Sequence, residues 1–156
     1  LEFGDRSLGC RSILADPRPA SIKSKINFSI KYRENYRPFA PSVISEKSHI
    51  FFNNKKNYKC NFMEKVINVR KKYANKLKAI THVDNSARVH TVNKNENNDF
   101  YKILKEFEKL TSYPILLNTS FNINGEPIVC SPDDAISTFY NSKIDVLFLG
   151  DYKIKR

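Results

Sequence analysis

The chain has 156 residues and is 40% hydrophobic, which is enough for one domain with a buried core and excludes an intrinsically disordered chain. Its 27 basic and 16 acidic residues give a net charge of +11, which points to an anionic partner. No apolar run approaches the roughly 20 residues that cross a membrane, and no secretory signal opens the chain, so we expect no membrane partner. Because the first residue is a leucine, we expect further chain upstream.

The first half of the chain is predicted to hold short elements joined by irregular segments. Isoleucines four residues apart predict a helix over residues 20–32, and two prolines end it soon afterwards. A strand is expected to begin within residues 42–45. Residues 46–62 are rich in Lys and Asn and are expected to form a flexible segment, whereas residues 66–69 and 87–92 have the composition of strands.

The second half carries clearer signals. A helix over residues 97–112 is expected to bury one apolar face, made of Phe100, Ile103, Leu104, Phe107 and Leu110. Ser131, a proline and two acidic residues predict the start of a second helix. The remaining expected elements are a buried strand over 114–118, a tight turn at Asn124-Gly125 between β-like runs at 121–123 and 127–130, and a final buried strand over 144–149. Together these elements predict a single mixed α/β domain.

The basic residues fall into two groups. Nineteen are lysines, and residues 47–78 hold ten basic residues and one acidic residue, which we interpret as a solvated surface rather than a groove for nucleic acid. Only eight are arginines, and five of these lie in the first 37 residues. Clustered arginines in a Lys-rich chain favour bidentate binding of phosphate or carboxylate, although ion pairing within the fold explains any single arginine equally well.

The cysteines and histidines do not form a recognisable metal site. There are three of each, widely spaced, with no Cys-x-x-Cys and no His-x-x-x-His pair. We therefore expect no metal ion in this chain. The odd number of cysteines favours a reducing, cytoplasmic setting.

Two segments near the start have the composition of an anion site. Residues 2–12 combine two glycines with Arg6 and Arg11, which is typical of a loop that approaches a phosphate, although an arginine-capped turn is the alternative. Lys31 and Arg33 are two residues apart. In an extended segment they would project to the same side and meet one anion, although such pairs are also common on surfaces.

Two later segments add polar groups. Residues 81–84 read Thr-His-Val-Asp and are followed by Arg88, and we interpret them chiefly as a turn closed by the aspartate, since no activated nucleophile accompanies them. Residues 116–122 run from a buried strand into alternating Asn118, Ser120 and Asn122. Because ligands bind at the carboxyl ends of strands in α/β domains, these three side chains are predicted to face one pocket.

In this order and spacing the segments resemble the C-terminal domain of NodU/CmcH-type O-carbamoyltransferases. Family members open with a sequence like Glu-Phe-Gly-Pro-Arg-Ala-Leu-Gly-Asn-Arg-Ser-Ile-Leu-Ala-Asp-Pro-Arg, to which residues 2–18 are similar, with Asp5 in place of proline and Cys10 in place of asparagine. The two replacements put the shape of the loop in doubt. The resemblance continues through residues 31–34, 37–42, 81–84, 87–89, 116–122 and 125–129, and so spans nearly the whole chain.

The resemblance implies a YrdC-like fold, a twisted mixed sheet with flanking helices over residues 1–156. It also implies a nucleotide site with a Lys-x-Arg pair, matched by Lys31 and Arg33, and a Ser-x-Asn pair, matched by Ser120 and Asn122. In complete enzymes such a domain makes carbamoyl adenylate from carbamoyl phosphate and ATP, with Mg²⁺ arriving on the ATP. An upstream Kae1-like domain, which holds a metal ion and is absent from this sequence, then transfers the carbamoyl group to a hydroxyl.

On this resemblance we expect Lys31 and Arg33 to be catalytic. The residues expected to bind nucleotide or carbamoyl phosphate are Arg6, Arg11, Arg88, Asn118, Ser120 and Asn122. Two alternatives remain open. The chain is a nucleotide- or RNA-binding module or remnant without turnover, or it belongs to threonylcarbamoyladenosine synthesis, although the Glu-Phe-Gly-x-Arg and Thr-His-Val-Asp segments favour the carbamoyltransferase branch.

Overall fold

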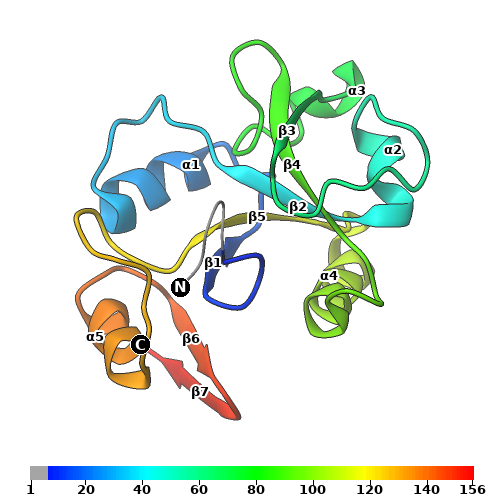
Figure 1. Cartoon of the computed structure of the whole chain (residues 1–156). Coiled ribbons are helices and arrows are strands. Elements are labelled where there is room, and N and C mark those ends of the chain that lie inside the picture. The colour runs from blue at the N-terminus through cyan, green and yellow to red at the C-terminus, as the bar shows by residue number, and fades with distance from the viewer. Residues whose placement is uncertain (1–6) are drawn as a thin grey trace.

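The protein folds around a five-stranded mixed sheet and a separate two-stranded hairpin, seen in a computed structural model that describes residues 7–156 (Figure 1). The strand order in the larger sheet is β1-β5-β2-β4-β3, with only the β2–β4 pair parallel. The strands are β1 Ser12–Ala15, β2 Ala40–Ile44, β3 Lys65–Asn68, β4 Ser86–Val92, β5 Ile115–Ser120, and the hairpin strands β6 Val146–Leu149 and β7 Tyr152–Lys155.

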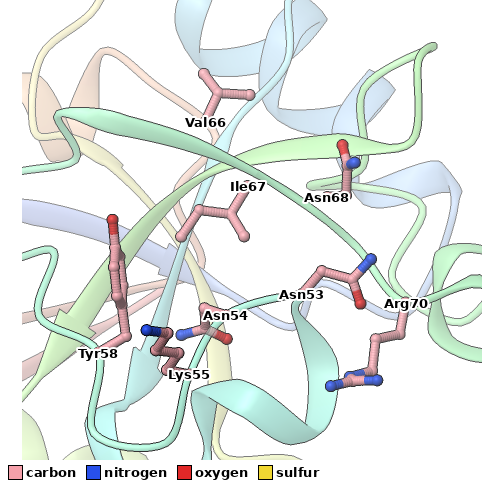
Figure 2. Close-up of a pocket in the computed structure, with 8 residues that line it drawn as sticks. All are labelled: Asn53, Asn54, Lys55, Tyr58, Val66, Ile67, Asn68 and Arg70. Carbon is pink, nitrogen blue, oxygen red and sulfur yellow. The ribbon is translucent and has the colours of Figure 1, made fainter.

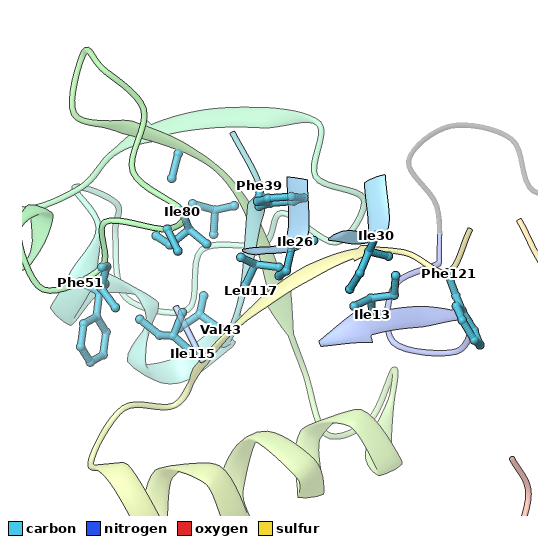
Figure 3. Packing of buried hydrophobic residues seen from close by; sticks show 14 of the residues in the cluster. Ile13, Ile26, Ile30, Phe39, Val43, Phe51, Ile80, Ile115, Leu117 and Phe121 are labelled. Carbon is cyan, nitrogen blue, oxygen red and sulfur yellow. The ribbon is translucent and has the colours of Figure 1, made fainter. Parts of the chain in front are cut away.

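Different helices pack on the two faces of the sheet, α1 and η1 on one face and α4 on the other. The helices are α1 Ser21–Ile26, the π-helical turn η1 Asn27–Lys31, the 3₁₀ turn η2 Ser45–Lys47, α2 Ser48–Phe51, α3 Lys71–Ala74, α4 Asn98–Thr111 and α5 Pro132–Tyr140. On one face the apolar side chains of α1 and η1 pack on β2 and β5, where Ile26, Val43 and Leu117 are fully buried (Figure 3). This confirms the mixed α/β fold that the sequence predicts.

The opposite face packs against α4. Side chains alternate along a strand, so Ile44 and Leu116 point away from the larger cluster and meet Phe100 and Leu104 of α4. The predicted apolar face of this helix is only partly buried. Leu110 is 85% exposed, because it lies about 120° around the helix from Leu104.

Three sequence predictions need correction. The helix predicted over 20–32 is α-helical only for Ser21–Ile26 and then widens into η1. The β-like runs around the Asn124-Gly125 turn form no strands, although the turn itself is present. The final strand is not fully buried, since it pairs with β7 in a hairpin and Phe148 is exposed.

The Lys/Asn-rich segment over residues 46–62 is not wholly irregular. It begins with η2 and α2, and Cys60 within it is fully buried, with its backbone N–H bonded to Thr91 Oγ1 at 2.8 Å. No helix within residues 7–156 has the length and apolar character needed to span a bilayer.

The start of α5 confirms a local prediction. Ser131 Oγ accepts a hydrogen bond from the Asp134 N–H at 3.1 Å, and Asp134 Oδ2 accepts from the Ser131 N–H at 2.9 Å, which forms a capping box with Pro132 at the first position.

Replacing Ser131 with alanine is expected to lower the free energy of unfolding by about 1 kcal/mol, because the first turn of α5 loses its cap. Urea unfolding measures this, with Ser131→Asp as the control variant that restores an acceptor at the cap position. Equal losses in both variants would contradict the capping argument.

Candidate functional site

The tightest polar cluster joins Lys31 to the end of β5. The Lys31 ammonium donates to the backbone oxygens of Ser120 at 2.6 Å and Asn122 at 3.0 Å, and its Nζ also lies 2.8 Å from Asn122 Oδ1 and 3.2 Å from Ser120 Oγ. Ser120 Oγ in turn donates to Asn122 Oδ1 at 2.6 Å. The structure therefore brings together three of the predicted site residues, from segments about 90 positions apart.

The fold directs Lys31 inward through an unusual turn. Lys31 is the last residue of η1, and Tyr32 after it lies in the left-handed region with φ 43°. The extended geometry by which we expected Lys31 and Arg33 to project to one side is therefore wrong. Arg33 makes no hydrogen bond to this cluster in the described residues, although its charge acts on Lys31. Its Nε donates to Asn27 Oδ1 at 2.8 Å, and its guanidinium stacks on Phe39 at 4.5 Å from the ring centroid.

Cationic charge gathers around this cluster. Lys31 is only 5% exposed, and burial together with the charge of Arg33 lowers its pKa to about 7. Burial and the charges of Arg37 and Arg88 likewise lower the pKa of Arg33. The charges of Lys31 and Arg33 therefore repel each other, and an anion placed between them would weaken this repulsion.

A row of buried polar side chains continues the site across the sheet. Asn118 on β5 donates from Nδ2 to Ser42 Oγ on β2 at 2.9 Å, and Ser42 Oγ lies 2.8 Å from His90 Nδ1 on β4. Burial lowers the pKa of His90 to about 4, so the imidazole is neutral at pH 7. Arg88 precedes His90 by two residues and so projects from the same face of β4.

This face is the one that α4 covers only in part. The Asn118 Oδ1 atom is buried and has no hydrogen-bond partner within residues 7–156, which leaves a polar atom unsatisfied at the β5 end of the row. The sequence did not single out Ser42 or His90. Their alignment depends on the parallel register in which Ser42 lies opposite His90, and no local pattern reports such a register.

Leu8 and Gly9, from the described part of the predicted phosphate loop, lie against the first turn of α4. Arg6 lies outside the described residues. Arg11 donates from Nη1 to the carbonyl oxygen of Val129 at 2.8 Å, which fixes it near the chain that follows β5. The Ser7 hydroxyl is buried and has no partner among the residues from 7 onward.

Two other features stand apart from this cluster. Residues 81–84 form the predicted turn, in which Asp84 Oδ1 accepts from the Ser86 N–H at 3.0 Å and from the Ser86 hydroxyl at 2.6 Å. A hollow of about 700 Å³ lies beside β3 (Figure 2). Its lining is Asn53, Asn54, Lys55, Tyr58, Val66, Ile67, Asn68 and Arg70, and so includes none of the predicted site residues that the structure describes.

Fold and cluster together define a basic mixed α/β domain with a buried lysine and a row of polar side chains on one sheet face. In residues 7–156 no three His, Cys, Asp or Glu side chains gather as a metal site would require.

Over its whole length, residues 1–156, the chain matches the family model described as "Carbamoyltransferase C-terminus". The chain belongs to this carbamoyltransferase family.

Curated relatives agree with this assignment. The chain is 51% identical over 158 residues to nodulation protein NolNO of Sinorhizobium fredii and 49% identical over 156 residues to nodulation protein NolO of Bradyrhizobium diazoefficiens. Each match covers 99% of this chain but only 23% and 28% of the relative. Nodulation protein U of Azorhizobium caulinodans is 39% identical over 124 residues. The chain thus spans about a quarter of the length of the curated relatives that it matches.

Proposed function

We propose that this domain binds ATP and carbamoyl phosphate and forms carbamoyl adenylate within an ATP-dependent O-carbamoyltransferase. In this reaction water cleaves the P–O bond of carbamoyl phosphate and releases inorganic phosphate and carbamate. A carbamate oxygen then forms a bond to the α-phosphorus of ATP as the bond from that phosphorus to pyrophosphate breaks. An upstream Kae1-like domain of the same protein then transfers the carbamoyl group to a hydroxyl. We place the protein in the cytoplasm, where both substrates occur, and assign it no membrane partner.

The observation that carries the proposal is the buried Lys31 at the end of β5. Its Nζ contacts Ser120 and Asn122, so the lysine amine, the serine hydroxyl and the asparagine amide lie together at the carboxyl end of β5. A ligand with several phosphate oxygens offers strong acceptors to this ammonium and to the nearby guanidinium of Arg33. The pKa of Lys31, lowered to about 7, favours an incoming anion because the anion restores the charged form.

We assign roles to the predicted residues accordingly. Lys31 and Arg33 contact the carbamoyl and phosphate oxygens and are the catalytic residues. Arg6, Arg11 and Arg88 add phosphate contacts, and Asn118, Ser120 and Asn122 donate or accept hydrogen bonds. Catalysis then consists of positioning and charge stabilisation, with Mg²⁺ supplied on ATP and no covalent enzyme intermediate.

The test is exchange of labelled pyrophosphate into ATP that depends on carbamoyl phosphate, measured in the full-length protein. Lys31→Ala combined with Arg33→Ala is expected to reduce this exchange by at least about 10²-fold, since two charge-stabilising donors are lost. Lys76→Ala is a matched control, because it removes an exposed lysine that follows α3. Exchange that survives the double substitution would refute the assigned roles.

A second candidate is a nucleic-acid-binding module, which the hollow beside β3 favours. Its lining combines the aromatic ring of Tyr58, on which a base can stack, with the cations Lys55 and Arg70. The dependence of ligand binding on salt concentration distinguishes the two functions. ATP is expected to raise the melting temperature at low and high salt alike if the β5 site is specific, whereas RNA binding should weaken steeply as salt rises.

A further inference from the structure

The loop that precedes β1 is held in a strained conformation. Leu8 has φ 40° and Gly9 has φ 102°, so two consecutive residues lie at positive φ and the first of them is not glycine. A residue with a side chain is strained in the left-handed region, and such strain persists only where the surrounding contacts fix it. The loop also has internal hydrogen bonds, from the Cys10 N–H to the Ser7 oxygen at 2.7 Å and from the Gly9 N–H to Ser12 Oγ at 3.0 Å.

The contacts that fix this loop come from the first turn of α4. Asn97 Oδ1 accepts from the Phe100 N–H at 3.1 Å and so caps the helix, while Asn97 Nδ2 donates to the carbonyl oxygen of Leu8 at 3.1 Å. The oxygen of the Asn97 side-chain amide therefore bonds to the helix, and its nitrogen bonds to the strained residue Leu8. Phe100 lies directly against Gly9, where a Cβ atom would come within 2.5 Å of its ring.

The same turn also reaches the polar row on the sheet. The ring of Phe100 lies 6.0 Å from that of His90, which is bonded to Ser42 and through it to Asn118. A continuous path of contacts thus runs from Leu8 through α4 to the site residues on β4, β2 and β5. The first turn of α4 is the part that touches both the loop and the row.

We propose that Asn97 is a positioning residue that holds residues 8–11 against the first turn of α4, next to the polar row. In this position the backbone of the loop and the side chain of Arg11 contact the phosphates of the substrate. This rests on the proposed function. Asn97 acts through Leu8 and does not itself contact the substrate. A purely structural cap would serve α4 equally well as serine or threonine, whereas the second hydrogen bond requires the amide.

Asn97→Ser separates the two tasks, since serine caps a helix as well as asparagine but lacks the amide that reaches Leu8. In the full-length protein we expect Asn97→Ser to lower the melting temperature only slightly, to raise the KM for ATP in pyrophosphate exchange about tenfold, and to leave kcat within about twofold. Hydrogen exchange at the Cys10 amide should become faster in the same variant. Asn97→Ala should show the same change in KM and a larger fall in melting temperature, because it also removes the helix cap.

The outcomes distinguish the two proposals. A wild-type protein without carbamoyl-phosphate-dependent exchange overturns the proposed function and this inference together. An active wild type with unchanged KM and unchanged Cys10 exchange in Asn97→Ser overturns this inference alone. A rise in KM that appears only in Asn97→Ala, in step with its loss of stability, reduces Asn97 to a helix cap and also overturns it.

Discussion

Replacing Gly9 with alanine is expected to lower the free energy of unfolding by about 3 kcal/mol or more. Two costs add. The new Cβ would come within 2.5 Å and 2.6 Å of two ring atoms of Phe100, which is 2% exposed and packs with Ile44 and Leu104, so the ring has little freedom to move. Overpacking of this kind costs about 1–3 kcal/mol, and the φ of 102° adds about 1–2 kcal/mol for any residue with a side chain.

Gly125 provides the control for this prediction. It also has a positive φ, 81°, but a Cβ there has no atom within 4 Å, so Gly125→Ala should cost only the backbone part, about 1–2 kcal/mol. Urea unfolding of the two variants compares the costs directly. In a Phe100→Leu background the cost of Gly9→Ala should fall, because the smaller side chain leaves room. Equal losses for Gly9→Ala and Gly125→Ala would show that contact with Phe100 is not the cause.

Local chemistry accounts for the parts of the fold that the sequence predicted well. Helices α4 and α5 begin where an asparagine and a serine supply side-chain caps, and each signal lies within three or four residues of the backbone that it satisfies. The strand before Asn118 was equally predictable, because a run of apolar residues has few alternatives once it is buried. Asn118, Ser120 and Asn122 were predicted to face one pocket. Ser120 and Asn122 share the contact with Lys31, whereas Asn118 donates to Ser42 on the neighbouring strand.

Two features could not be predicted from the sequence: the register in which distant strands pair, and the π-helical geometry of η1. The contact between Lys31 and Ser120 joins residues 89 positions apart, and it depends on η1 widening so that the last side chain turns inward. Nothing in the spacing of isoleucines distinguishes a π turn from another α-helical turn. The alignment of Ser42 with His90 likewise follows from a parallel pairing between strands that are not adjacent in sequence.

Lys31 is expected to make the stability of the domain depend on pH in an unusual direction. Burial and Arg33 lower the pKa of Lys31 from 10.5 in the unfolded chain to about 7 in the folded domain. Between these values the unfolded chain binds a proton that the folded domain does not bind. Stability therefore rises with pH across this window, and the contribution between pH 7.5 and 9.5 is about 2–3 kcal/mol.

Lys31→Gln isolates this contribution, since glutamine can still donate to Ser120 and Asn122 but does not titrate. The measurement is the free energy of unfolding of both proteins at several pH values from 7 to 10, in which every other group titrates alike and cancels in the difference. The wild-type curve should rise relative to that of the variant as pH increases. Parallel curves would mean that the four oxygen atoms around Nζ hold Lys31 fully charged, because an ammonium satisfies more of these acceptors than a neutral amine.

Saturating ATP should reduce the rise of the free energy of unfolding with pH in the wild type alone. Phosphate oxygens near Nζ would favour the charged form of Lys31 and move its pKa back toward 10.5.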